Sequence, residues 1–218
     1  MDFFLKIQEK KKRKIHEEDD DFSKEKILRL QYDIIDKWKD TSETFYLTKG
    51  PPNLGILGAL SGIFVHNHYR KKLKLGTYGR ATSYLPIVVL PAIVAPMVHK
   101  MVFQAKILLG EYKCSLCVQM KAGLTQAALA VVYPGVLAPF ASFMYATRHF
   151  TYRLPSITQN PREVFTLWSK LSKPIVKPVI GLLLANYFAA QFLTYKELKD
   201  FHSIMTKLDQ RTTALEAL

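Results

Sequence analysis

The chain has 218 residues and a formal net charge of +13, and 49% of its residues are hydrophobic. This length fits one soluble domain, so length alone excludes no class of protein. A high positive charge is compatible with nucleic-acid binding. The basic residues, however, occur in short clusters between long apolar segments, with no aromatic motif or groove-entering helix to use them. We therefore expect no nucleic-acid partner.

The N-terminal segment, residues 1–21, is dense in charge. Its basic block is followed directly by an acidic block in the run KIQEKKKRKIHEEDDD, residues 6–21, a pattern typical of solvated, disordered chain. The segment lacks the apolar core and small-residue cleavage site of a secretory signal peptide, and it is too acidic for a standard mitochondrial presequence. We expect disorder here and place any import signal further along the chain.

Residues 22–49 have the pattern of an amphipathic helix followed by a linker. Ser23 is a suitable N-cap, and the face opposite the apolar positions is charged. Such a helix lies on a membrane surface, against a partner or, equally well, against the loops of its own protein. The apolar positions at helical spacing are Ile27, Leu30, Ile34 and Trp38, with Leu28 and Ile35 beside them.

Four nearly uncharged windows follow, at residues 53–69, 83–105, 122–146 and 175–195. A helix needs about 20 apolar residues to cross a hydrocarbon core about 30 Å thick, where every backbone polar group must be satisfied within the segment. The sequence thus predicts an all-α polytopic membrane protein. We expect four transmembrane helices in a domain spanning residues 50–200 and a C-terminal tail at residues 201–218.

The first window is the shortest, and it ends in the polar run His66, Asn67 and His68. A buried core helix in a soluble protein is the alternative for this segment. The window also carries small residues at helical spacing, among them Gly58 and Gly62, which form a face that another helix can approach closely. This contact is either internal or with a partner, and internal packing is favoured.

Prolines interrupt the second window at positions 86, 91 and 96. Each proline removes a backbone donor and crowds the carbonyl of the preceding turn, so we expect a kinked helix. Membrane helices tolerate such breaks because neighbouring groups satisfy the freed carbonyls.

The chain has two cysteines, Cys114 and Cys117. Their spacing suits a loop disulfide, a redox pair or half of a zinc site. Zinc requires four ligands and no second ligand pair follows, so we expect no metal site. Membrane oxidoreductases of the vitamin K epoxide reductase type use such a pair, but often with a second cysteine pair that this chain lacks. A loop disulfide or two idle thiols is the favoured interpretation.

No phosphate-binding loop, metalloprotease motif or nucleophile elbow occurs, and no carboxylate lies inside a window. We expect no enzymatic activity, no cofactor and no small-molecule substrate. His99, Lys100 and Lys177 lie near window ends, where snorkelling to the interface explains them. Asn186 and Gln191 are expected to form hydrogen bonds between helices.

Several motifs in order resemble the transmembrane protein 126 family of the mitochondrial inner membrane. The resemblance covers about residues 54–200, and its strength lies in the order of the pieces. They are GALSGIFVHNHYRKK at residues 58–72, Leu85-Pro86, Leu90-Pro91, CSLCVQMKAGLTQAALAVVYP at residues 114–134, Leu154-Pro155, and WSKLSKP at residues 168–174.

This resemblance implies a non-enzymatic assembly factor, or chaperone, for membrane-arm subunits of respiratory complex I (NADH dehydrogenase). The implied location is the mitochondrial inner membrane, and the implied partners are complex I membrane subunits, other assembly factors and the lipid bilayer. The alternatives are a membrane thiol-disulfide oxidoreductase that uses Cys114 and Cys117, and a permanent accessory subunit of a respiratory complex.

For the assembly factor we expect two groups of contact residues. The helix and partner contacts are expected at Gly58, Gly62, Pro86, Pro91, Tyr133 and Pro134. The basic run Arg70, Lys71 and Lys72 is expected to meet anionic lipid or a partner on the matrix side.

Overall fold

A computed structural model describes residues 23–152 and 161–216, and the charged segment expected at residues 1–21 lies outside them. The described residues form helices and connecting turns, with no strand among them. After a first helix at residues 23–36, the elements are α2 (Phe45–Lys72), α3 (Arg80–Tyr84), η1 (Leu85–Val89), α4 (Leu90–Val98), η2 (His99–Gln104), α5 (Ala105–Leu108), α6 (Ser115–Ala127), η3 (Ala128–Val132), α7 (Tyr133–Arg148) and α8 (Pro161–Glu216).

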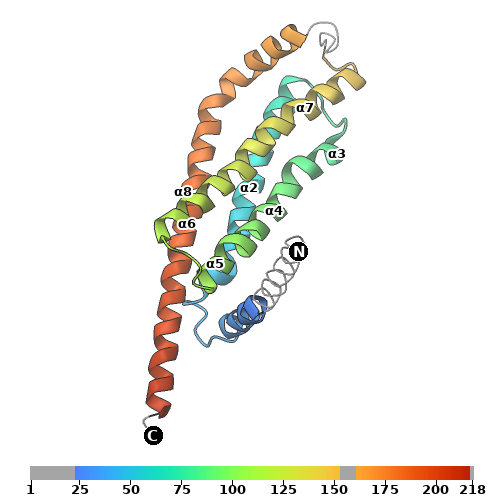
Figure 1. Cartoon of the computed structure of the whole chain (residues 1–218). Coiled ribbons are helices and arrows are strands. Elements are labelled where there is room, and N and C mark those ends of the chain that lie inside the picture. The colour runs from blue at the N-terminus through green and yellow to red at the C-terminus, as the bar shows by residue number, and fades with distance from the viewer. Residues whose placement is uncertain (1–22, 153–160, 217–218) are drawn as a thin grey trace, which may run out of the picture.

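These elements combine into four long helical rods that pack side by side (Figure 1). The first rod is α2. The second is the continuous run from α3 to α5, the third runs from α6 to α7, and the fourth is α8. Each apolar window of the sequence falls within one rod, so the all-helical prediction is confirmed.

Three of the rods are long and apolar enough to cross a membrane: residues Arg80–Leu108, Ser115–Arg148 and Arg162–Gln210. α2 is not among them, so the four-span count is not confirmed by length and composition. The reason lies in its sequence, because glycines, Ser61 and the run from His66 to His68 lower its hydropathy.

Wide π-helical turns interrupt the second rod, for which the prolines predicted a kinked helix. In the π turn η1, the N–H of Leu90 bonds to the carbonyl of Leu85, five residues earlier. The turn η2 repeats this pattern with Ala105 and Lys100. Because such turns are inserted singly into α-helices, the rod continues through Pro86, Pro91 and Pro96.

Apolar clusters fill much of the interior between the rods, and much of their outer surface is apolar as well. One core cluster joins Val65 of α2, Ile87 of η1 and Ala138 of α7. Large apolar side chains also point outward from every rod, as expected for helices surrounded by lipid. Examples are Ile56, Leu60, Phe64, Leu90, Ile93, Met97, Leu124, Val132, Phe140, Ile180, Leu184 and Phe188.

α8 has 56 residues, which corresponds to about 84 Å of helix. It runs along the whole bundle and extends past its lower end (Figure 1). The residues expected as a C-terminal tail, 201–218, therefore begin inside this helix, and those up to Glu216 are helical.

The helix at residues 23–36 packs on the bundle with a different face from the one expected to be apolar. Ile35 is buried against Leu47, Leu108 and Ile204, with Leu28 and Tyr32 beside it. Three of the four positions of the expected apolar stripe point outward, with Ile27 45% exposed, Leu30 58% and Ile34 36%. The fourth, Trp38, packs against this cluster.

Candidate functional site: a buried polar clamp

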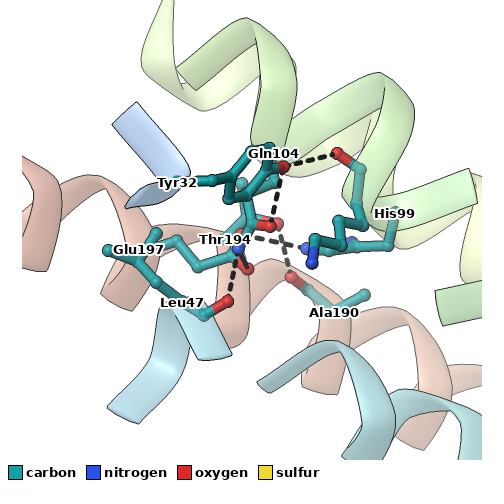
Figure 2. A network of polar contacts seen from close by, with 8 residues as sticks. Tyr32, Leu47, His99, Gln104, Ala190, Thr194 and Glu197 are labelled. Atoms are coloured by element: carbon teal, nitrogen blue, oxygen red, sulfur yellow. Dashed lines mark hydrogen bonds and ion pairs between the residues drawn. The ribbon is translucent and has the colours of Figure 1, made fainter. Parts of the chain in front are cut away.

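A histidine and a carboxylate meet inside the bundle, far apart in sequence (Figure 2). The Nε2 atom of His99, which begins η2, lies 2.9 Å from the Oε2 atom of Glu197 on α8. Their side chains are 3% and 0% exposed. A buried ionisable residue is costly unless it is paired, so this contact is the candidate functional site.

Gln104 satisfies the second oxygen of the carboxylate. Its Nε2 atom donates to the Oε1 atom of Glu197 at 3.1 Å and to the backbone carbonyl of Leu47 at 2.7 Å. Three rods therefore meet at one point, because Leu47 belongs to α2, Gln104 to η2 and Glu197 to α8.

The π turn explains why His99 and Gln104 reach the same carboxylate. Residues five apart in an α-helix lie about 140° apart around its axis, since each residue turns by about 100°. A π turn, closed by an i→i+5 hydrogen bond, holds more residues per turn than an α-helix, so residues five apart lie closer together around the axis. η2 spans both residues, so the wide turn brings the two side chains to Glu197 together.

Tyr32 closes the cluster from the first helix (Figure 2). Its hydroxyl donates to the Oε1 atom of Gln104 at 3.1 Å, and the ammonium group of Lys100 lies 4.8 Å from the centre of its ring. Burial, together with the nearby Glu197 carboxylate, raises the pKa of Tyr32 to about 12. The phenol thus stays protonated and remains a hydrogen-bond donor over the whole neutral range. We call Tyr32, His99, Gln104 and Glu197 the polar clamp.

The clamp corrects the expectation for His99, which points inward instead of snorkelling to the interface. Its physical reason is Glu197, which the hydropathy windows placed just outside the fourth segment and which sequence inspection did not select. No pattern in the sequence links positions 98 residues apart. The available signal was a carboxylate two residues beyond an apolar window, three residues after Thr194.

A second polar cluster lies in the middle of the bundle. The Nδ2 atom of Asn186 donates to the Oγ atom of Ser61 at 2.9 Å, and Gln126 donates to the Oδ1 atom of Asn186 at 3.2 Å and to the Leu54 carbonyl at 3.0 Å. The hydrogen bond expected from Asn186 between helices is confirmed. Gln191 instead donates to Tyr187 of its own helix, at 2.9 Å.

Arg70 was expected at the lipid or partner surface, but the structure turns it inward. It is 5% exposed and donates to the Ser83 hydroxyl at 3.0 Å and to the carbonyls of Gly76 and Tyr78, each at 2.9 Å. The guanidinium group of Arg70 thus stabilises the loop that follows α2. Lys71 and Lys72 are exposed, so two of the three basic residues remain available at the surface.

Two glycines of α2 lie where this helix packs closely against the second and third rods. A Cβ atom on Gly62 would lie 3.1 Å from the carbonyl oxygen of Ile87 in η1. A Cβ atom on Gly58 would lie 3.3 Å from Ala130, four residues before Pro134. The structure places both glycines in internal helix contacts.

Tyr133 joins the third rod to the second. Its hydroxyl donates to the carbonyl oxygen of Pro86 at 3.2 Å. Pro91 follows five residues after Pro86, and in a π turn it would be the residue whose N–H bonds to that carbonyl. The phenol therefore supplies a donor that proline withholds, while Pro91 and Pro134 are themselves buried.

Cys114 and Cys117 are free, exposed thiols at the start of α6. Cys114 is the N-cap, and its Sγ atom accepts a hydrogen bond from the backbone N–H of Cys117 at 3.3 Å. Hydrogen bonds from the Cys117 thiol and backbone lower the pKa of Cys114. Within the residues that the structure describes, no group of three or more His, Cys, Asp or Glu side chains is arranged to hold a metal ion.

The sequence is similar to proteins of one known family. A sequence profile described as Transmembrane protein 126 matches residues 27–214. The chain is 44% identical to Transmembrane protein 126 of Drosophila melanogaster over 188 residues, which cover 85% of this chain and 84% of the fly protein.

The mammalian relatives are more distant. Identity to Transmembrane protein 126A of Mus musculus is 23% over 158 residues, 72% of this chain and 78% of the mouse protein. Identity to Transmembrane protein 126A of Homo sapiens is 24% over 150 residues, 68% of this chain and 74% of the human protein. No solved structure matches the chain. The family profile and the fly relative each cover most of the sequence, and the chain belongs to the transmembrane protein 126 family.

Proposed function

We propose that the protein is a non-enzymatic assembly factor that holds membrane-arm subunits of respiratory complex I in the mitochondrial inner membrane. The proposal is supported by the distribution of polar and apolar side chains between the interior of the bundle and its outer surface. Polar side chains of the clamp and of the Asn186 cluster bond to one another inside, whereas large apolar side chains point outward from all four rods. Such a surface suits lateral binding of hydrophobic partner helices.

We also propose that α2 crosses the bilayer as a fourth span. Its 28 residues correspond to about 42 Å of helix, more than the hydrocarbon core requires. It packs against the second, third and fourth rods, and its exposed side chains Ile56, Leu60 and Phe64 lie four residues apart along one face. The polar Ser61 faces inward and is bonded to Asn186.

Separation of mitochondrial membranes on a native gel, followed by detection of this chain, tests the assembly role. An assembly factor migrates with complex I subassemblies and is absent from the finished complex. Presence in the finished complex at equal amounts would instead identify a permanent accessory subunit.

The state of the cysteines supports a second candidate, a thiol-disulfide oxidoreductase. Both thiols are exposed, and Cys114 sits at a helix N-terminus with a lowered pKa, as in reactive cysteine pairs. Replacing both cysteines with serine separates the two functions. The variant supports normal assembly if the protein is an assembly factor and fails to do so if the thiols carry the activity.

A further inference from the structure

Contacts at both ends and the middle hold the helix at residues 23–36 across one end of the bundle. The Nζ atom of Lys24 lies 2.9 Å from the Oε1 atom of Glu111. In the middle, Tyr32 donates to Gln104. Just past the C-terminal end, the indole N–H of Trp38 donates to Glu43 at 3.0 Å. The helix is therefore fixed along its length.

These contacts also set its depth relative to the bilayer. Glu111 lies in the loop between the second and third rods, Leu108 ends the candidate span that begins at Arg80, and Leu47 lies near the start of α2. All of these positions are where the rods leave the apolar region. Figure 1 shows the helix beside α5 at this end. The helix therefore lies at the level of the membrane interface.

Around its axis the helix has three distinct sides. At about 100° per residue, the packed side carries Leu28, Tyr32 and Ile35, which contact the bundle. One flank, about 100 to 160° away, carries Ile27, Leu30 and Ile34, all exposed. The opposite flank is charged: it carries the ion pairs Arg29–Glu25 at 2.7 Å and Lys37–Asp33 at 2.8 Å, together with Asp36.

We propose that residues 23–36 form an interfacial helix whose Ile27, Leu30 and Ile34 flank inserts among bilayer lipids while its Arg29 and Asp33 flank faces water. The helix packs on the bundle with one side, so its other two sides face lipid and water. The apolar flank buries its surface among acyl chains, and the charged flank keeps its hydration.

Lipid fits this flank better than another protein does. Met97 and Met101 are exposed within the last three turns of the second rod, so the apolar outer surface of that rod extends toward this end. A stable protein interface buries about 800 Å² on each partner, from roughly 20 residues. A stripe of three partly exposed side chains offers a small fraction of that area. The assignment does not depend on the proposed assembly function.

Spin labels on the purified full chain test the assignment. In a background with Cys114→Ser and Cys117→Ser, labels at Leu30→Cys and Ile34→Cys report the apolar flank, and labels at Arg29→Cys and Asp33→Cys are matched controls on the charged flank. The protein is reconstituted in phosphatidylcholine vesicles that contain phosphatidylglycerol. We expect the ratio of oxygen to nickel-chelate accessibility to be several-fold higher at positions 30 and 34 than at 29 and 33.

Equal access of the nickel chelate to all four positions would overturn the proposal, because both flanks would then lie in water. Protection of positions 30 and 34 from both reagents would also overturn it, because a second copy of the chain would then cover the flank. A measurement on the unmodified chain guards against misfolded variants. Photoactivatable phospholipids in the same vesicles should label Ile27, Leu30 or Ile34, and labelling confined to the rods would contradict the assignment.

Discussion

His99 Nε2 and Glu197 Oε2 lie 2.9 Å apart although 98 positions separate the two residues in the chain. The contact joins the second rod to the fourth, and Gln104 extends it to α2. The bundle is therefore closed at this end by polar groups instead of by apolar packing alone.

Replacing one member of this pair should destabilise the fold strongly. His99→Leu leaves the Glu197 carboxylate buried without its partner, and such changes cost about 3 to 5 kcal/mol. The free energy of unfolding in detergent, followed by circular dichroism, measures the loss. Glu163→Gln, at an exposed carboxylate near the start of α8, is the control and should change stability little.

The double variant His99→Leu with Glu197→Leu separates pairing from burial. Because neither ionisable group is then left in the interior, we expect it to recover most of the stability that His99→Leu loses. A double variant as unstable as the sum of the single ones would show that the two groups do not interact.

The glycine contacts predict a position-dependent cost along the chain. A Cβ atom at Gly55 would lie 2.5 Å from the backbone oxygen of Ala92, so Gly55→Ala must push two helices apart and should cost about 1 to 3 kcal/mol. Gly181→Ala on α8 is the matched control, because nothing lies within 4 Å of its Cβ position. That change should be neutral or stabilise the helix by about 0.5 to 1 kcal/mol. Equal effects at the two sites would argue against the packing of α2 on the second rod.

Tyr133→Phe removes the donor that reaches the carbonyl of Pro86. The expected loss is about 0.5 to 1.5 kcal/mol, the usual net value of one hydrogen bond. Tyr195, exposed on α8, provides the control: thermal unfolding of Tyr195→Phe should match that of the wild type. A Tyr133→Phe variant with wild-type stability would mean that another group satisfies the carbonyl.

The two thiols should differ in reactivity with pH. The lowered pKa of Cys114 means that its thiolate forms at a lower pH than an unperturbed thiol, whose pKa is about 8.5. Alkylation by iodoacetamide, quantified for each cysteine by mass spectrometry, should therefore reach its plateau at lower pH for Cys114. Cys117→Ala removes the thiol that hydrogen-bonds to Cys114, and it should move that plateau upward. Identical pH profiles with and without Cys117 would contradict the hydrogen bond.

Hydropathy and proline positions were sufficient to predict an all-helical membrane protein, because burial in lipid leaves a direct trace in composition. The number of spans was harder to predict. α2 satisfies its polar residues with partners on other rods, such as Asn186 for Ser61, and average hydropathy does not register this. The glycine positions indicated a close helix contact, and the structure shows that Gly62 approaches Ile87 and Gly58 approaches Ala130.

The polar clamp was not predictable from the sequence. It depends on a π turn that rotates Gln104 toward the same side as His99, and pattern searches assume the α-helical period. Arg70 was misplaced for a related reason. Clusters of basic residues usually mark a surface, whereas here the loop from Gly76 to Tyr78 folds back and offers its carbonyls to the guanidinium group.

Depletion of the protein from cells, followed by pulse labelling of mitochondrial translation products, tests the proposed assembly role most directly. The account predicts that newly made membrane-arm subunits of complex I fail to advance from their subassemblies, and that re-expression of wild-type chain or of the Cys114→Ser, Cys117→Ser variant restores their progress. Complex I that assembles at an unchanged rate without the protein would contradict the account.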